Sequence, residues 1–148
     1  MIANGFANRF MYAVRLSKPL PLGGRFDDES TAQLAQQTVQ AIGHQQHRPL
    51  RFDPIAEKLW REQYLVLSDE RPGLLGAITA RAEAQVLRLS LLYALLDRTP
   101  AIGLAHLKAG LAVWRYCDAS AKLIFGDKIG DPIADTILPV LKQAGQTA

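Results

Sequence analysis

Two arginines in one apolar segment are the residues of this chain whose type and spacing most directly suggest chemistry. Arg81 and Arg88 lie in the sequence ARAEAQVLRLSLLYAL, with Gln85 between them. At about 3.6 residues per turn, this spacing places all three side chains on one face of a helix. A guanidinium group stays charged and presents a planar fork of donors. A pair of arginines on one helix face is therefore suited to binding an anion.

A structural role accounts for the same two arginines. From Val86 onward almost every residue is apolar, which predicts a helix that is buried on most sides. Such a helix needs one polar edge, and long arginine stems cover apolar surface well, so spacing alone favours a solvated stripe. Arg88 lies deeper in the apolar run, and we expect a structural role for it, anchored by a carboxylate or by carbonyl oxygens. Arg81 lies at the first turn, where the helix dipole disfavours a cation, and this position favours a functional role.

A second set of cations recurs every seven residues nearer the C-terminus, at Lys108, Arg115 and Lys122. A ridge of this kind can follow the phosphates of a nucleic acid, so these three residues are the candidate nucleic-acid-binding positions. Asp118 lies between Arg115 and Lys122 at helical spacing. A solvent-exposed face of salt bridges is therefore the favoured interpretation of the ridge.

The histidines and the cysteine of the sequence do not form a recognisable metal-binding motif. His44 and His47 are three residues apart, but no cysteine and no nearby carboxylate completes a site, so we interpret them as exposed loop residues. His106 has no partner that the sequence identifies. Cys117 falls on an apolar helix stripe and is expected to be a core residue. We therefore expect no metal site.

The composition is that of a globular protein of ordinary size. The chain has 148 residues, of which 49% are hydrophobic and 21% charged, so it can bury a core and is not of a disordered type. The net charge of +3 only slightly favours an anionic partner such as nucleic acid. A single cysteine excludes an intrachain disulfide, and neither a signal peptide nor a membrane span is recognisable. We expect a cytoplasmic protein with no membrane partner.

The pattern of the chain predicts a mainly α protein, a helical bundle with one N-terminal strand. The aromatic and branched residues 9–17 indicate the β-strand. A lone strand leaves its backbone groups unpaired, so we expect residues 9–17 to pair with a second copy or to be disordered. Helices are expected at about 29–43, from Pro54 with Asp53 as its cap, from about Leu74 or Thr79 to Leu96, at 104–125, and from Asp131 until Pro139 kinks or shortens the last one.

Two of these helices have buried stripes that contain tryptophan. The helix from Pro54 is expected to bury Ile55, Leu59, Trp60 and Tyr64. The helix at 104–125 carries apolar residues at alternating steps of three and four, among them Trp114. We therefore expect structural roles for both tryptophans.

The order of these features resembles part of a known class of ATPase. The stretch ANRFMYAVRLS resembles the Ser-Arg-Phe motif and following strand of minichromosome-maintenance helicases, which are AAA+ proteins. The stretch TARAEAQVLRLSLLYALLDRTPAIGLAHLKAGLAVWRYC is similar to the helical lid of that family. Over nearly the whole chain, GFANRF, RLSKPLPLGG, RPGLLGAITARAEAQVLRLSLLYALLD and IFGDKIGDPIAD look like the C-terminal part of bacterial primase-helicase-like P-loop ATPases of plasmids and phages.

The resemblance implies roles for particular residues. Arg9 matches the arginine finger that reaches the ATP of a neighbouring subunit, and Arg81 matches the second sensor of the nucleotide state. Residues 1–24 would be the last strand and turn of a missing ATPase core, and residues 25–148 a lid-like bundle. The partner would be an ATPase core, or a second copy that pairs through residues 9–17.

The chain contains no GxxxxGK[ST] phosphate loop, so we expect it not to be an enzyme alone. It should neither hydrolyse ATP nor bind it at micromolar strength, and ATP with Mg²⁺ would be cofactors only of a complete homologue. The alternative is a stand-alone helical interaction or nucleic-acid-binding module, in which the ridge of Lys108, Arg115 and Lys122 carries the binding.

Overall fold

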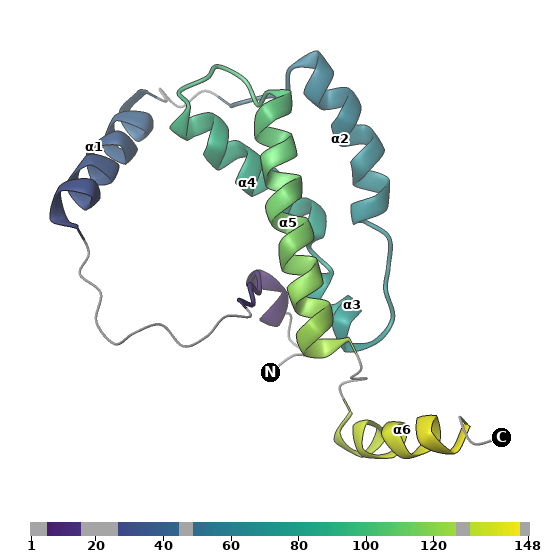
Figure 1. Cartoon of the computed structure of the whole chain (residues 1–148). Helices are drawn as coiled ribbons and strands as arrows, with labels where there is room; N and C mark the ends of the chain where they lie inside the picture. The colour runs from purple at the N-terminus through teal and green to yellow at the C-terminus, as the bar shows by residue number, and fades with distance from the viewer. Residues whose placement is uncertain (1–5, 16–26, 45–48, 127–130, 146–148) are drawn as a thin grey trace.

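The protein is mainly helical, as the computed structural model shows for residues 6–15, 27–44, 49–126 and 131–145 (Figure 1). The elements follow in the order η2 (Ala7–Arg9), α1 (Asp28–His44), α2 (Pro54–Leu67), α3 (Gly73–Thr79), α4 (Ala82–Leu96), α5 (Leu104–Phe125) and α6 (Pro132–Gly145). The predicted helical bundle is confirmed. The predicted N-terminal strand is wrong, because no strand occurs within the described residues.

The centre of the fold is a close-packed hairpin of α4 and α5. Gly110 of α5 lies so near α4 that an added Cβ would be 2.7 Å from the Ser90 hydroxyl and 3.1 Å from the Val86 carbonyl oxygen. The Ser90 hydroxyl itself donates to that carbonyl, so its polarity is satisfied within α4. Small residues at the crossing therefore let the two helices approach closely. The bounds predicted for α5 are confirmed.

Helix α2 covers this hairpin and begins as the sequence predicts. The Asp53 side chain accepts a hydrogen bond of 2.7 Å from the Ala56 amide, and Pro54 occupies the first turn. The stripe expected to be buried is partly wrong, because Ile55 is 67% exposed and Tyr64 45% exposed. Ala56 is buried in their place. The helix is rotated so that its smallest apolar residue meets the hairpin, which allows a short distance between the backbones.

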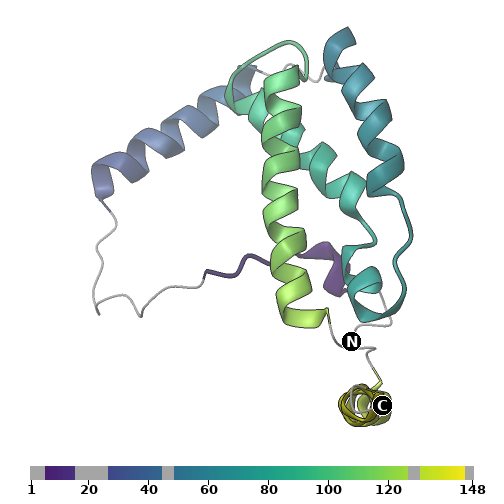
Figure 2. The same cartoon turned by 45° about the vertical axis from the view of Figure 1, so that its right-hand side comes forward.

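The N-terminal segment lies against the helices of its own chain. Residues 7–9 form η2, which packs beside α3, and residues 10–15 continue past α5 (Figure 2). The Val14 amide donates to the Ser120 hydroxyl at 3.1 Å, and the Tyr116 hydroxyl donates to the Val14 carbonyl. These side chains of α5 satisfy backbone groups that a neighbouring strand would otherwise have to satisfy. The described residues 9–15 are therefore not a lone strand, and pairing with a second copy stays a prediction. Residues 16 and 17 lie outside the described ranges.

Two helices contribute little to the core. Helix α1 is exposed along most of its length, as predicted, with Ala41 as its buried residue. Helix α6 follows beyond the C-terminal end of α5 (Figure 1). It runs on to Gly145, so Pro139 does not shorten it as expected.

Candidate functional site

The structure attaches η2, which contains Arg9, to α4 through one buried side chain. Gln85 is only 7% exposed. Its Nε2 donates hydrogen bonds to the carbonyl oxygens of Arg9 at 3.2 Å and Asn8 at 3.5 Å. Gln85 lies between Arg81 and Arg88 in the sequence, so η2 is fastened to α4 within a turn of each. We name Arg9 and Arg81 the arginine cluster, and Arg88, on the exposed surface of α4, is not part of it.

Arg81 occupies the junction between α3 and α4. The sequence left open whether one helix begins at Leu74 or Thr79, and the structure has two helices, with Arg81 as the N-cap of the second. No side chain caps the first turn of α4, and the Arg81 carbonyl accepts the Gln85 amide at 3.0 Å. The positive end of the α4 dipole and a half-buried guanidinium therefore lie together, and both favour an anion. Glu83 in the same turn offsets part of this charge.

The arginine cluster is free of ion pairs within the described parts of the chain. The ion pairs there join Arg61 to Glu57, and Arg71 and Lys122 to Asp118. A guanidinium without an ion-pair partner keeps its capacity to bind an external anion. The cluster is therefore available to an anion, as are Arg51, Lys108 and Arg115, which also lack an ion pair among the described residues.

The expectation that Arg88 is buried and anchored is wrong. Its side chain is exposed and makes no hydrogen bond or ion pair with the described residues. The reason is that the bundle does not surround α4. Its buried residues are Ala82, Gln85, Val86, Ser90 and Ala94, whereas the apolar Leu87, Leu92 and Leu96 are themselves exposed.

The effect of Arg88 on stability should accordingly be small. We expect Arg88→Ala to change the free energy of unfolding by less than about 0.5 kcal/mol, as is usual for an exposed position. Chemical denaturation followed by circular dichroism measures this change. A loss of several kcal/mol would show that Arg88 has an anchoring partner.

The side chains of Lys108, Arg115 and Lys122 are all exposed, but that of Lys122 is in an ion pair. Lys122 pairs with Asp118 at 3.0 Å, and Asp118 also accepts a hydrogen bond from Arg71 in the loop before α3. Burial raises the pKa of Asp118, but the hydrogen bonds and charges of Arg71 and Lys122 outweigh it and hold the pKa below its ordinary value. Salt bridging thus neutralises the C-terminal end of the ridge.

A pH dependence follows from Asp118. A lowered folded-state pKa means that the ion pairs add stability above the ordinary pKa of 3.8, and that this stability is lost as the pH falls through the folded-state value. We expect Asp118→Asn to lower the free energy of unfolding at pH 7 by about 1 kcal/mol. The difference from the unmodified chain should vanish below the folded-state pKa. A difference that persists in urea titrations at strongly acidic pH would contradict this origin.

His106 has partners that the sequence did not reveal. Its buried ring joins the two ends of the α4–α5 connection, since Nδ1 accepts the Gly103 amide at 2.9 Å and Nε2 lies 3.0 Å from the Asp97 carboxylate. Because Nδ1 accepts a backbone N–H, the ring proton resides on Nε2 and is donated to Asp97. The only signal in the sequence was a histidine three residues after a helix-starting glycine. This ring stabilises the hairpin connection.

We expect His106→Ala to lower the free energy of unfolding by about 1–2 kcal/mol, the range of a lost helix cap. Asp97→Asn is the matched control, because an asparagine oxygen still accepts the Nε2 proton. Its effect should be clearly smaller in the same urea titration. Equal losses in both variants would assign the stabilisation to the contact with the Asp97 carboxylate and not to the cap.

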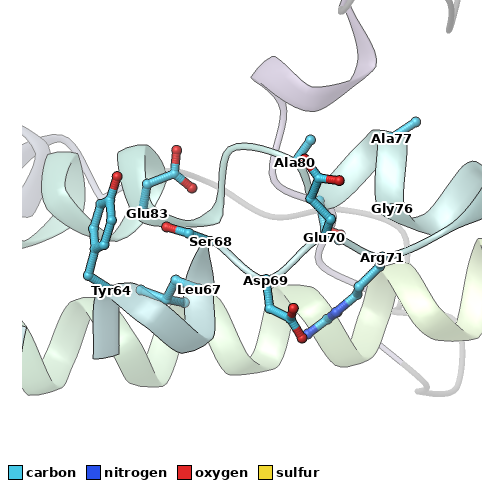
Figure 3. Close-up of a pocket in the computed structure, with 11 residues that line it drawn as sticks. Tyr64, Leu67, Ser68, Asp69, Glu70, Arg71, Gly76, Ala77, Ala80 and Glu83 are labelled. Carbon is cyan, nitrogen blue, oxygen red and sulfur yellow. The ribbon is translucent and has the colours of Figure 1, made fainter. Parts of the chain in front are cut away.

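A pocket of about 410 Å³ opens between the end of α2, the following loop, α3 and the start of α4 (Figure 3). Asp69, Glu70 and Glu83 line it together with Arg71 (Figure 3). The charge of Arg71 is offset by its ion pair with Asp118, which lies outside the pocket lining. The charge of the three carboxylates has the wrong sign for a phosphate. We therefore assign the arginine cluster, and not this pocket, as the candidate site.

The remaining candidates lie as follows. In the parts of the chain that the structure describes, no group of three His, Cys, Asp or Glu residues could hold a metal ion. His44 ends α1, and His47 lies outside the described residues.

Cys117 is buried as predicted, and burial raises the pKa of its thiol. Trp114 belongs to the core cluster, and Trp60 packs against it.

Comparison with known proteins assigns no relationship. The chain matches no known family, no curated protein and no solved structure. In the described ranges, no helix combines the length and the apolar character needed to cross a membrane.

Proposed function

We propose that this chain is the finger-and-lid part of a primase-helicase-like P-loop ATPase that takes part in DNA replication. It does not catalyse alone. Its arginine cluster binds the phosphates of ATP held on a separate ATPase core or on a neighbouring subunit in the cytoplasm. The proposal rests on the sequence resemblance together with the position of the cluster.

The hydrogen bonds from Gln85 to η2 are the observation that carries this proposal. They attach the turn that contains the finger candidate Arg9 to the helix whose N-cap is the sensor candidate Arg81, although the two arginines are far apart in the sequence. Both arginines lack an ion pair among the described residues. These observations support a common role for the two cations at one polyphosphate.

The cluster acts by electrostatics in this mechanism. Charge develops on the phosphoryl oxygens as the terminal phosphate is transferred, and positioned guanidinium groups stabilise it without a proton transfer. Because η2 is bonded to α4 by Gln85, movement of the lid also moves Arg9. Gln85 is thus a positioning residue, because it makes Arg9 and Arg81 move together when the lid moves.

A titration of the isolated chain with Mg-ATP tests the proposal. Without a core to hold the nucleotide, we expect no hydrolysis and no binding at micromolar concentrations by calorimetry. At millimolar triphosphate, the arginine Nε–H NMR signals of Arg9 and Arg81 should shift, and those of Arg115 should shift less. Tight one-site binding, hydrolysis, or larger shifts at Arg115 would overturn the proposal.

A stand-alone nucleic-acid-binding module is the second candidate function. Its supporting observation is that Lys108 and Arg115 are exposed and free of ion pairs within the described residues. In that case Arg115→Ala should weaken the binding of a DNA oligonucleotide, and Arg81→Ala should not. The reverse order of effects would exclude the ridge as the binding surface.

A further inference from the structure

An aromatic depression lies at the start of α2, on a different element from the arginine cluster. It has a volume of about 400 Å³ and is lined by Arg51, Phe52, Glu57, Trp60 and Arg61. The rings of Phe52 and Trp60 are stacked, with centroids 5.5 Å apart and planes inclined by 27°. Both rings are half-buried, so part of each remains accessible.

The two rings are held by the fold. Residues 51–53 pair with the α4–α5 connection, because the Ile102 amide donates to the Arg51 carbonyl at 2.8 Å and the Asp53 amide donates to the Ile102 carbonyl at 3.1 Å. Phe52 and Trp60 also pack against the hydrophobic core. Tyr64 contacts the indole in a T-shaped arrangement, with centroids 5.7 Å apart. A stacked pair fixed in this way loses little conformational freedom when a further ring stacks on it.

The charges around the rings are cationic on balance. Arg61 pairs with Glu57 at 2.6 Å, which fixes one guanidinium at the rim. Arg51 is exposed and makes no ion pair with the described residues. The depression therefore combines a fixed aromatic surface with one free guanidinium and one oriented guanidinium.

We propose that this depression binds a base of a single-stranded nucleic acid. The base stacks on the Phe52–Trp60 pair, and Arg51 contacts the adjoining phosphate. Stacking surfaces flanked by cations are the means by which proteins bind single strands without reading their sequence. An acidic peptide would use the arginines but would leave the aromatic surface unused, so the two partners are distinguishable.

Binding should be observable through Trp60. The chain has two tryptophans, and Trp114 is only 8% exposed. In the Trp114→Phe variant Trp60 is the only indole, and we expect an oligothymidylate to quench its fluorescence. Anisotropy of a labelled oligothymidylate with the unmodified chain gives a second readout that needs no change to the core.

Two substitutions separate the contributions of stacking and charge. We expect Trp60→Leu to weaken the binding of the oligonucleotide by about tenfold or more. Arg51→Ala, at an exposed position that should not affect folding, should weaken binding and reduce the salt dependence by about one counterion. Arg115→Ala on α5 tests the ridge as the competing binding surface, and we expect it to change affinity little.

Several results would overturn the proposal. They are an absence of measurable binding, equal affinity for an abasic oligonucleotide of the same length, and quenching of Trp60 by polyglutamate. Loss of binding in Arg115→Ala with no effect of Arg51→Ala would assign any nucleic-acid contact to the ridge. None of these results depends on ATP, so the proposal and the nucleotide role of the arginine cluster can fail separately.

Discussion

Truncation of Leu107 to alanine should lower the free energy of unfolding by about 2–5 kcal/mol, the range for a leucine removed from a packed interior. Leu107 is 0% exposed and is the largest fully buried side chain among the described residues. It belongs to the core cluster with Ala56 of α2, Val86 of α4 and Trp114 of α5. A cavity at this point would loosen all three helices at once.

Leu123→Ala is the matched control for this prediction. It makes the same chemical change on the same helix, at a position that is 62% exposed. We expect it to cost less than about 0.5 kcal/mol. Urea denaturation followed by circular dichroism compares the two variants. Similar losses would mean that α5 does not present Leu107 to a common core.

The long amphipathic helix α5 could be predicted from the sequence because its signal is local and repeated. Its apolar residues recur over many turns, and the structure buries Leu107, Leu111, Trp114 and Cys117 on that face. The start of α2 could also be predicted, because a capping aspartate followed by proline starts a helix through neighbouring residues alone. In both cases neighbours along the chain determine the outcome.

Helix α4 shows where such reasoning fails. A continuous apolar run predicts burial on most sides, but periodicity does not reveal whether enough other elements exist to cover every side. Here α5 contacts α4 most extensively, and Leu92 remains exposed. Arg88 lies on the uncovered surface for the same reason. Burial of a helix is a property of the whole fold and not of its own sequence.

The prediction for the N-terminal segment was wrong for a related reason. Its aromatic and branched residues favour a strand locally, but distant hydrogen bonds decide its structure. The partner of Val14, Ser120, is 106 residues away, and the partner of Arg9, Gln85, is 76 residues away. Because η2 and α4 are far apart in the sequence, their contact at the candidate site could not be predicted. Arg9 and Arg81 were selected by resemblance, and nothing in the sequence indicated that Gln85 would join them.

Replacing the arginine that corresponds to Arg81 should lower ATP turnover by ~10³-fold in a complete primase-helicase-like ATPase, the scale of arginines that stabilise phosphoryl transfer. This expectation rests on the proposed function. In the present chain, Arg81→Ala should leave the melting temperature nearly unchanged, because the guanidinium has no ion pair to lose among the described residues. The two measurements together separate a role in catalysis from a role in folding.

The position that corresponds to Arg88 supplies the control in the complete ATPase. Arg81 is the N-cap residue of α4, whereas Arg88 lies within α4 on its exposed surface. Only the former combines a guanidinium with the positive end of the helix dipole. We therefore expect the Arg88-type variant to retain most of its turnover in steady-state ATPase assays. Normal turnover in the Arg81-type variant would exclude the second-sensor role, and equal losses in both would assign the effect to the helix as a whole.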